Sequence, residues 1–151
     1  MSFENFISQL KSKASELKNE ALKFKNKDFL NATMAGSALI AMADGSISSE
    51  EKQKMIRFIE SNDALSVFTT SDVIKAFQEF VGQIEFDKDI GEAKAYGAIG
   101  KMKSNEAAAR LLVRMNIAIA SSDGNFDDKE KKVAVKIIKE LQLNPTEFEL
   151  G

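Results

Sequence analysis

The sequence predicts an all-α protein, folded as a compact bundle of about seven helices, and three observations support this. Apolar residues recur with a helical period along most of the chain. The only proline is Pro145, so no proline interrupts a helix before the last few residues. A pattern of helix, Asp-Gly loop and helix occurs twice, at Asp44 and 79 residues later at Asp123. The repetition predicts a pseudo-twofold internal repeat within a single domain, residues 1–151.

A basic amphipathic helix is predicted within residues 1–27, from about Phe3 to Lys25. Its apolar residues are alternately four and three positions apart, which forms a coiled-coil-like seam, and lysines occupy the other faces. The seam consists of Phe3, Ile7, Leu10, Ala14, Leu17, Ala21 and Phe24. Two uses are open. The seam packs on the rest of the bundle, or the helix makes peripheral contact with an anionic membrane or a partner helix.

The second and third helices form the first repeat unit, about residues 28–62. The second is predicted from about Asp28 to Ala43, and its small residues between positions 32 and 38 would let another helix approach closely. The third is predicted from about Ser49 to Ser61, with Phe58 and Ile59 facing inward. The unit therefore places an apolar helix before the Asp-Gly loop and an amphipathic helix after it.

Two helices connect the repeat units. The fourth begins after Thr70-Ser71, and its apolar stripe includes Val73, Phe77 and Ile84. The fifth covers about residues 90–102 and contains three glycines, which weaken its helical tendency. We expect it to turn Ala93, Tyr96 and Ile99 inward.

The sixth and seventh helices form the second repeat unit, about residues 105–141. They are predicted at about 105–121 and 128–141 and correspond to the second and third helices. Asn144 directly before Pro145 then predicts a capped terminal turn with proline at its first helical position.

Composition excludes several classes of function. The chain contains neither cysteine nor histidine, which removes disulfides, thiol redox chemistry, histidine catalysis and most zinc or copper sites. We expect no redox cofactor. The net charge of −2 and the lack of a basic, aromatic patch argue against nucleic-acid binding. No apolar run spans a bilayer and no signal-peptide core is present, so a cytoplasmic location is expected.

The doubled loop has a purely structural interpretation. Ser48 followed three residues later by Glu51 is the sequence of a capping box, and Asp127 followed by Glu130 is another. Gly45 stands where a chain leaving a helix often adopts a left-handed conformation. On this interpretation the loop residues cap helices and bind no ligand.

The loop also has a functional interpretation. Asp, Gly, an apolar residue and Glu stand at the offsets found in the second half of an EF-hand calcium loop. One half-loop supplies too few oxygens, but two side by side could hold a hard cation such as Ca²⁺, Mg²⁺ or Mn²⁺. The ligands would be Asp44, Glu51, Asp123 and Glu130, with Asp127 or Glu50 nearby.

Nearly the whole chain resembles the TerB-like family of tellurite-resistance proteins. The likeness includes the lysine-rich first helix and the segments 48–56, 122–128 and 145–148. It implies a bacterial stress-response protein with a helical-repeat fold and a metal-binding role for matching acidic residues. These are Asp44, Glu50, Glu51, Asp123, Asp127 and Glu130. It also implies partners, namely a membrane Ter protein and calcium-binding Ter proteins, at the inner face of the membrane.

The expected function is therefore a non-enzymatic tellurite-resistance and stress-response module. It would bind a hard divalent cation or a protein partner through its paired acidic Asp-Gly loops. The alternative is that the loops are structural caps on a scaffold that tethers a Ter complex to the inner membrane surface. An enzyme is disfavoured because the sequence has no motif for a nucleophile, a phosphate cradle or a dinucleotide.

Overall fold

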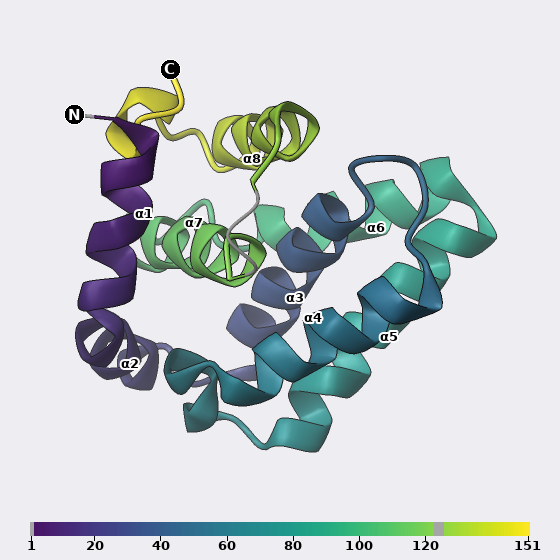
Figure 1. Ribbon diagram of the computed structural model, residues 1–151, viewed down its shortest axis with the longest axis horizontal. Coiled ribbons are helices and arrows are strands. Elements are labelled where there is room, and N and C mark those ends of the chain that lie inside the picture. Colours follow the sequence, from purple (N-terminus) through teal and green to yellow (C-terminus); the bar gives the residue numbers. More distant parts are fainter. Residues whose placement is uncertain (1, 123–125) are drawn as a thin grey trace.

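The computed structural model describes residues 2–122 and 126–151, and within them every regular element is helical (Figure 1). The all-α prediction is confirmed. The α-helices are α1 (Phe3–Ser12), α2 (Ala14–Lys23), α3 (Lys27–Ala41), α4 (Ser49–Ser61), α5 (Thr70–Phe86), α6 (Lys88–Gly100), α7 (Glu106–Ala120) and α8 (Asp128–Glu140). Two 3₁₀ helices, η1 (Asp63–Val67) and η2 (Pro145–Phe148), complete them. In the described residues, no helix is long and apolar enough to cross a membrane.

The prediction of a single first helix is wrong, because this segment forms two helices. Lys13 has φ −111° and ψ 28°, outside the helical region, and it separates α1 from α2. The break lets the apolar seam follow a bent surface: α1 packs on α7, while α2 packs mainly on η1 (Figure 1). Phe3, Leu10, Leu17 and Ala21 of the seam are buried. The seam is therefore used within the bundle, the first of its two predicted uses.

The two repeat units have the same helix lengths. α3 and α7 contain 15 residues each, α4 and α8 contain 13 each, and every helix begins 79 residues after its counterpart. The capping residues correspond as well. Asn26 accepts a hydrogen bond from the amide of Phe29 at 2.8 Å, and Asn105 accepts one from Ala108 at 3.1 Å. The same local chemistry therefore starts both units.

The helix that precedes each repeat unit packs on the central helix of the other unit. α6, which leads into α7, packs on α3, whereas α2, which leads into α3, contacts α7. This reciprocal arrangement is what a pseudo-twofold axis between α3 and α7 produces. Both central helices lie in the middle of the molecule (Figure 1), and most of their side chains are buried.

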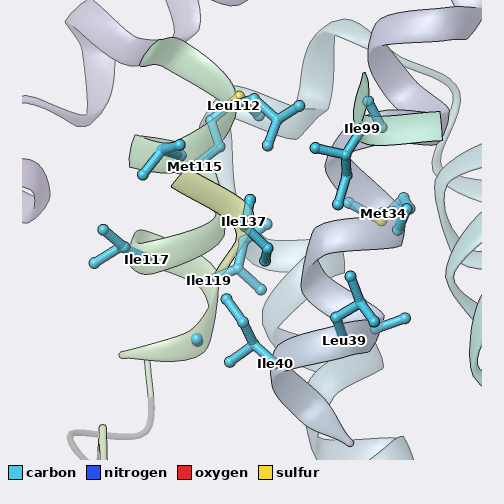
Figure 2. Packing of buried hydrophobic residues seen from close by; sticks show 14 of the residues in the cluster. Met34, Leu39, Ile40, Ile99, Leu112, Met115, Ile117, Ile119 and Ile137 are labelled. Atoms are coloured by element: carbon cyan, nitrogen blue, oxygen red, sulfur yellow. The ribbon is translucent and has the colours of Figure 1, made fainter. Parts of the chain in front are cut away.

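The hydrophobic core lies around α3 and α7. Burial of large aliphatic side chains stabilises such a core by about 1.5–3 kcal/mol for each residue fully removed from water. Figure 2 shows part of the core, in which side chains of α6, α7 and α8 gather beside those of α3. They are Ile99 of α6, Leu112, Met115 and Ile119 of α7, Ile137 of α8, and Met34, Leu39 and Ile40 of α3.

A polar contact lies at the crossing of α3 and α7. Buried Asn116 donates from Nδ2 to the carbonyl oxygen of Thr33 at 2.8 Å and to Oγ of Ser37 at 3.2 Å. Gly36 is required beside it, since a Cβ atom there would lie 2.0 Å from Oδ1 of Asn116. The small residues of α3 were predicted to permit close helix contact, but the approach of Asn116 to them was not predicted.

α6 is rotated relative to the prediction. Gly91, Ala95 and Ile99 face the core, and Ala93, which was predicted to point inward, is exposed. The reason is close packing on α5: a Cβ atom on Gly91 would lie 2.5 Å from the backbone of Ile84. The glycine that weakened the helix prediction is therefore what brings the two helices together.

Candidate functional site in the doubled acidic loop

The first loop leaves α3 through a tight turn and carries Asp44 outward. Gly45 has φ +92° and donates its amide to the carbonyl of Met42 at 2.8 Å. Glycine adopts this left-handed conformation at little cost, as the sequence predicted for this position. Ile47 is buried two residues later and pins the loop to the core, while Asp44 is exposed.

Both predicted capping boxes are present. Oγ of Ser48 accepts from the amide of Glu51 at 3.1 Å, and the Ser48 amide donates back to Oε1 of Glu51 at 3.0 Å. Asp127 and Glu130 form the same pair of bonds, at 2.8 Å and 2.9 Å. The predicted capping role of these four residues is therefore confirmed. They start α4 and α8 whatever else they do.

The capping bonds also set the ionisation of Glu51. Hydrogen bonds donated by the backbone and then the hydroxyl of Ser48 lower the pKa of this carboxyl below its ordinary value. Glu51 is therefore held in its charged form with one oxygen engaged, and Glu50, one residue earlier, is exposed in the first turn of α4. The first loop therefore presents three carboxylates, of which Asp44 and Glu50 are exposed and Glu51 is fixed by its capping bonds.

The two loops approach each other through an ion pair. Nζ of Lys129, in the first turn of α8, lies 3.8 Å from Oδ1 of Asp44. Lys129 occupies the position equivalent to Glu50, so the charge difference between the repeat units becomes a contact between them. Both side chains are more than half exposed, and surface pairs of this kind contribute about 0–1 kcal/mol. The pair is therefore easily opened by a competing ligand.

Asp123 lies outside the described residues, so its distance from Asp44 stays a prediction. In the part of the chain that the structure describes, no three acidic side chains are grouped closely enough to hold a metal ion. Of the six predicted ligands, Asp44 pairs with Lys129, Glu50 is exposed, and Glu51, Asp127 and Glu130 form the capping boxes.

An aromatic cluster fixes the second loop to the N-terminal helix. The ring of Phe126 lies 5.1 Å from that of Phe3, centroid to centroid, and Phe6 contacts Phe148 edge-on at 6.0 Å. Phe126 corresponds to Ile47 in the first loop, so each loop is anchored by its apolar residue. Only the second is anchored to α1, which distinguishes the surroundings of the two loops.

The start of α4, directly after the first loop, lies beside the end of α5. Lys52 in α4 bonds to Glu85 of α5, with 2.8 Å between Nζ and Oε1. Asp87 follows as the N-cap of α6 and accepts from the amide of Ile90 at 3.1 Å. The start of α4 and the end of α5 are therefore held side by side.

A cavity of about 490 Å³ lies behind the first loop, between α3, α6 and α8. Met42 and Ala43 form part of its wall, and Tyr96 lines it from α6. Burial, followed by the charges of Glu92 and Glu140, raises the pKa of Tyr96 to about 12. The tyrosine is therefore a neutral hydrogen-bonding group throughout the physiological pH range and no general base.

Sequence reasoning missed Lys129 as the residue that joins the loops. The signal was available, because Lys129 is the one charge reversal between two otherwise matching acidic motifs. It also missed η1, whose Ala64, Leu65 and Val67 are buried in only five residues. So short an element has too few turns to display a helical period.

Two comparisons with known proteins point to one family. A family model described as tellurite resistance protein TerB matches residues 30–150. The chain is 39% identical over 115 residues to a tellurium resistance protein TerB from Alcaligenes sp., an alignment that covers 76% of this chain and 94% of the relative. The comparison with solved structures found no match.

Proposed function

This chain belongs to the TerB family of tellurite resistance proteins, and we propose that within this tellurite-resistance role it is a non-enzymatic binding module. Its ligand would be a protein partner that contacts both acidic loops at once. The absence of histidine and cysteine from the sequence supports a binding role over catalysis, because the usual nucleophile and base pairs are lacking.

The observation that carries the proposal is the contact between Asp44 and Lys129. It joins the loops of two repeat units into one surface, with 3.8 Å between the charged groups. Both groups remain exposed, so a partner can exchange this weak pair for charged contacts of its own. The capping boxes hold the adjoining backbone in place, so the surface is preorganised for binding.

A hard divalent cation, Ca²⁺, Mg²⁺ or Mn²⁺, is the second candidate ligand. The order of residues in each loop supports it, since that order matches half of an EF-hand. The exposed carboxylates of Asp44 and Glu50 beside the charged Glu51 also support it. In this version of the proposal Lys129 would move away from Asp44 as the cation enters.

The partner suggested by the family likeness is a Ter protein at the inner face of the membrane, either the membrane component or a calcium-binding one. The exposed lysines of α1 and α2 suit an anionic membrane surface, because the apolar seam of these helices already packs on the bundle. The acidic loops would then be left for the protein partner in the cytoplasm.

Tolerance of tellurite tests the binding role in living cells. Asp44→Asn combined with Glu50→Gln should lower the tolerance conferred by the complete resistance operon while the protein accumulates normally. Asp28→Asn is the matched control, since Asp28 and Lys101 form a similarly exposed pair at 3.9 Å on another part of the surface. Unchanged tolerance in the loop variant would exclude the proposed surface.

NMR spectroscopy then distinguishes a cation from a protein partner. Each of Ca²⁺, Mg²⁺ and Mn²⁺ would be added separately to isotope-labelled protein, and the amides of Gly45 and Gly124 would be followed. Concerted shifts with one saturation curve, lost in Asp44→Asn, would assign the cation. No shift at either glycine, together with reduced tolerance in the loop variant, would leave the protein partner.

A further inference from the structure

Three large apolar side chains are conspicuously exposed in the described part of the chain: Leu22 at 53%, Phe86 at 93% and Ile90 at 55%. Phe86 is the last residue of α5, and Ile90 lies in the first turn of α6, so both belong to the α5–α6 corner. A nearly fully exposed phenylalanine does not contribute the free energy that burial of its ring would provide. Exposed aromatic side chains of this kind are enriched where proteins bind one another.

The α5–α6 corner is acidic. Asp87 and Asp89 lie between Phe86 and Ile90, with Lys88 between the two aspartates, and Glu85 directly precedes Phe86. Glu85 is neutralised by Lys52, but no lysine or arginine in the described ranges lies within ion-pairing distance of Asp87 or Asp89. The corner is thus an apolar projection with a net charge of about −1, from the two aspartates and Lys88.

The other end of α5 borders a pocket of opposite character. A cavity of about 460 Å³ lies between the starts of α3 and α5, with Leu30, Phe68 and Ala76 in its apolar wall. Lys25, Lys27 and Lys75 line its edge, and among the described residues none of the three forms an ion pair. Its volume falls in the range of pockets that bind ligands, which is about 300–1,000 Å³.

Two carboxylates, Asp72 and Glu79, also line this pocket from α5. Lysines nevertheless outnumber carboxylates in its lining, because Lys25, Lys27 and Lys75 face only these two acids. The pocket lining and the α5–α6 corner therefore carry net charges of opposite sign.

We propose that the α5–α6 corner of one copy docks into the α3–α5 pocket of a second copy. Phe86 and Ile90 would enter the apolar cavity, and Asp87 and Asp89 would face the lysines at its edge. α5 has 17 residues and is roughly 25 Å long, so its two ends are too far apart for a copy to fill its own pocket. Figure 1 shows the α5–α6 corner and α2 at opposite sides of the molecule.

The contact is heterologous, since the surface given by one copy differs from the surface offered by the next. Such contacts continue head to tail into rings or open chains of molecules. A single aromatic anchor with a charged rim buries less area than a stable dimer requires, so the association is weak and concentration-dependent. It is also weakened by salt, which screens exposed charges over about 10 Å at 0.1 M ionic strength.

Sedimentation velocity of the full chain tests the proposal. Between about 10 μM and about 1 mM protein at low salt, the sedimentation coefficient of the wild type should rise with concentration, and salt should suppress the rise. Phe86→Ala should lower the association constant at least tenfold, as expected for a central aromatic anchor. Phe86 is almost fully exposed, so circular dichroism of this variant should match the wild type.

Mixing two variants identifies the geometry. Phe86→Ala retains the pocket, and Lys27→Glu with Lys75→Glu retains the projecting corner; each should remain monomeric alone. An equal mixture should form dimers and stop there, because each dimer contains one intact contact. Lys132→Glu on exposed α8 is the charge control and should associate like the wild type. A wild type that stays monomeric up to about 1 mM, or a Phe86→Ala variant that associates equally well, overturns the proposal.

Discussion

Ser37 and Asn116 occupy equivalent positions in the two repeat units, 79 residues apart, and they hydrogen-bond to each other across 3.2 Å. Equivalent residues can contact one another only close to the axis that relates their units. The pseudo-twofold axis therefore passes through this buried pair. The pair is also where the symmetry is broken, since a hydroxyl on α3 faces an amide on α7.

Substitution of Gly36 tests how closely the helices approach at this axis. Gly36→Ala should destabilise the protein by about 1–3 kcal/mol, because its methyl group would overlap the side chain of Asn116. Gly97→Ala is the control: nothing lies within 4 Å of a Cβ atom at that helical position, and a gain of about 0.4–1 kcal/mol is expected. Urea unfolding followed by circular dichroism measures both. Equal effects would show that helix contact at the axis is not tight.

Removal of the caps tests the structural part of the acidic motif. Ser48→Ala and Asp127→Ala should each lower the free energy of unfolding by about 1 kcal/mol in metal-free buffer, because an amide at the helix start loses its acceptor. Asp44→Asn should change it by less than about 0.5 kcal/mol, since Asp44 caps no helix and lies exposed. Thermal unfolding in the presence of a chelator measures the three variants. A larger loss in Asp44→Asn than in the cap variants would contradict this division of roles.

The lowered pKa of Glu51 predicts a pH dependence of stability. A carboxyl with a lower pKa in the folded state binds fewer protons there, so it stabilises the fold above its unfolded pKa of about 4.5. That contribution should disappear as the pH falls through the folded value. Urea midpoints between pH 7 and pH 3 should fall less steeply for Glu51→Gln than for the wild type. Parallel curves would show that the capping bonds do not favour the charged carboxylate.

Tyr96 gives a second pH prediction, of opposite sign. Its folded pKa of about 12 exceeds the ordinary value of 10.0, so the neutral phenol stabilises the fold fully below pH 10. The contribution is lost as the pH rises from about 10 through about 12. Tyr96 is the only tyrosine, and absorbance of the tyrosinate anion therefore reports it directly. Glu92→Gln should lower the midpoint; a wild-type midpoint at 10 would contradict the prediction.

Local chemistry made the repeat units predictable, because each of their four helices begins with a side-chain cap. The sequence predicts caps at Ser48, Asp127 and Asn144, and each of these side chains caps its helix in the structure. The break at Lys13 was not predictable, since the apolar seam continues through it with unchanged spacing. Its cause is the bent surface formed by α7 and η1, which are distant in sequence. The exposure of Ala93 also depends on contacts between helices that the local sequence does not display. The contact between Lys129 and Asp44 likewise forms only when the fold brings the two repeat units together.

The central position of α3 affects how the protein is made. α3 is almost completely buried, and the helices that bury it, α5 to α8, are all synthesised after it. At 5–20 residues per second, a ribosome needs roughly 4–16 seconds to advance from the end of α3 to the end of α7. During this interval the nascent chain contains Met34, Leu39 and Ile40 without their native neighbours from α6, α7 and α8. Early translation is thus the period in which this protein most depends on chaperones that shield apolar segments.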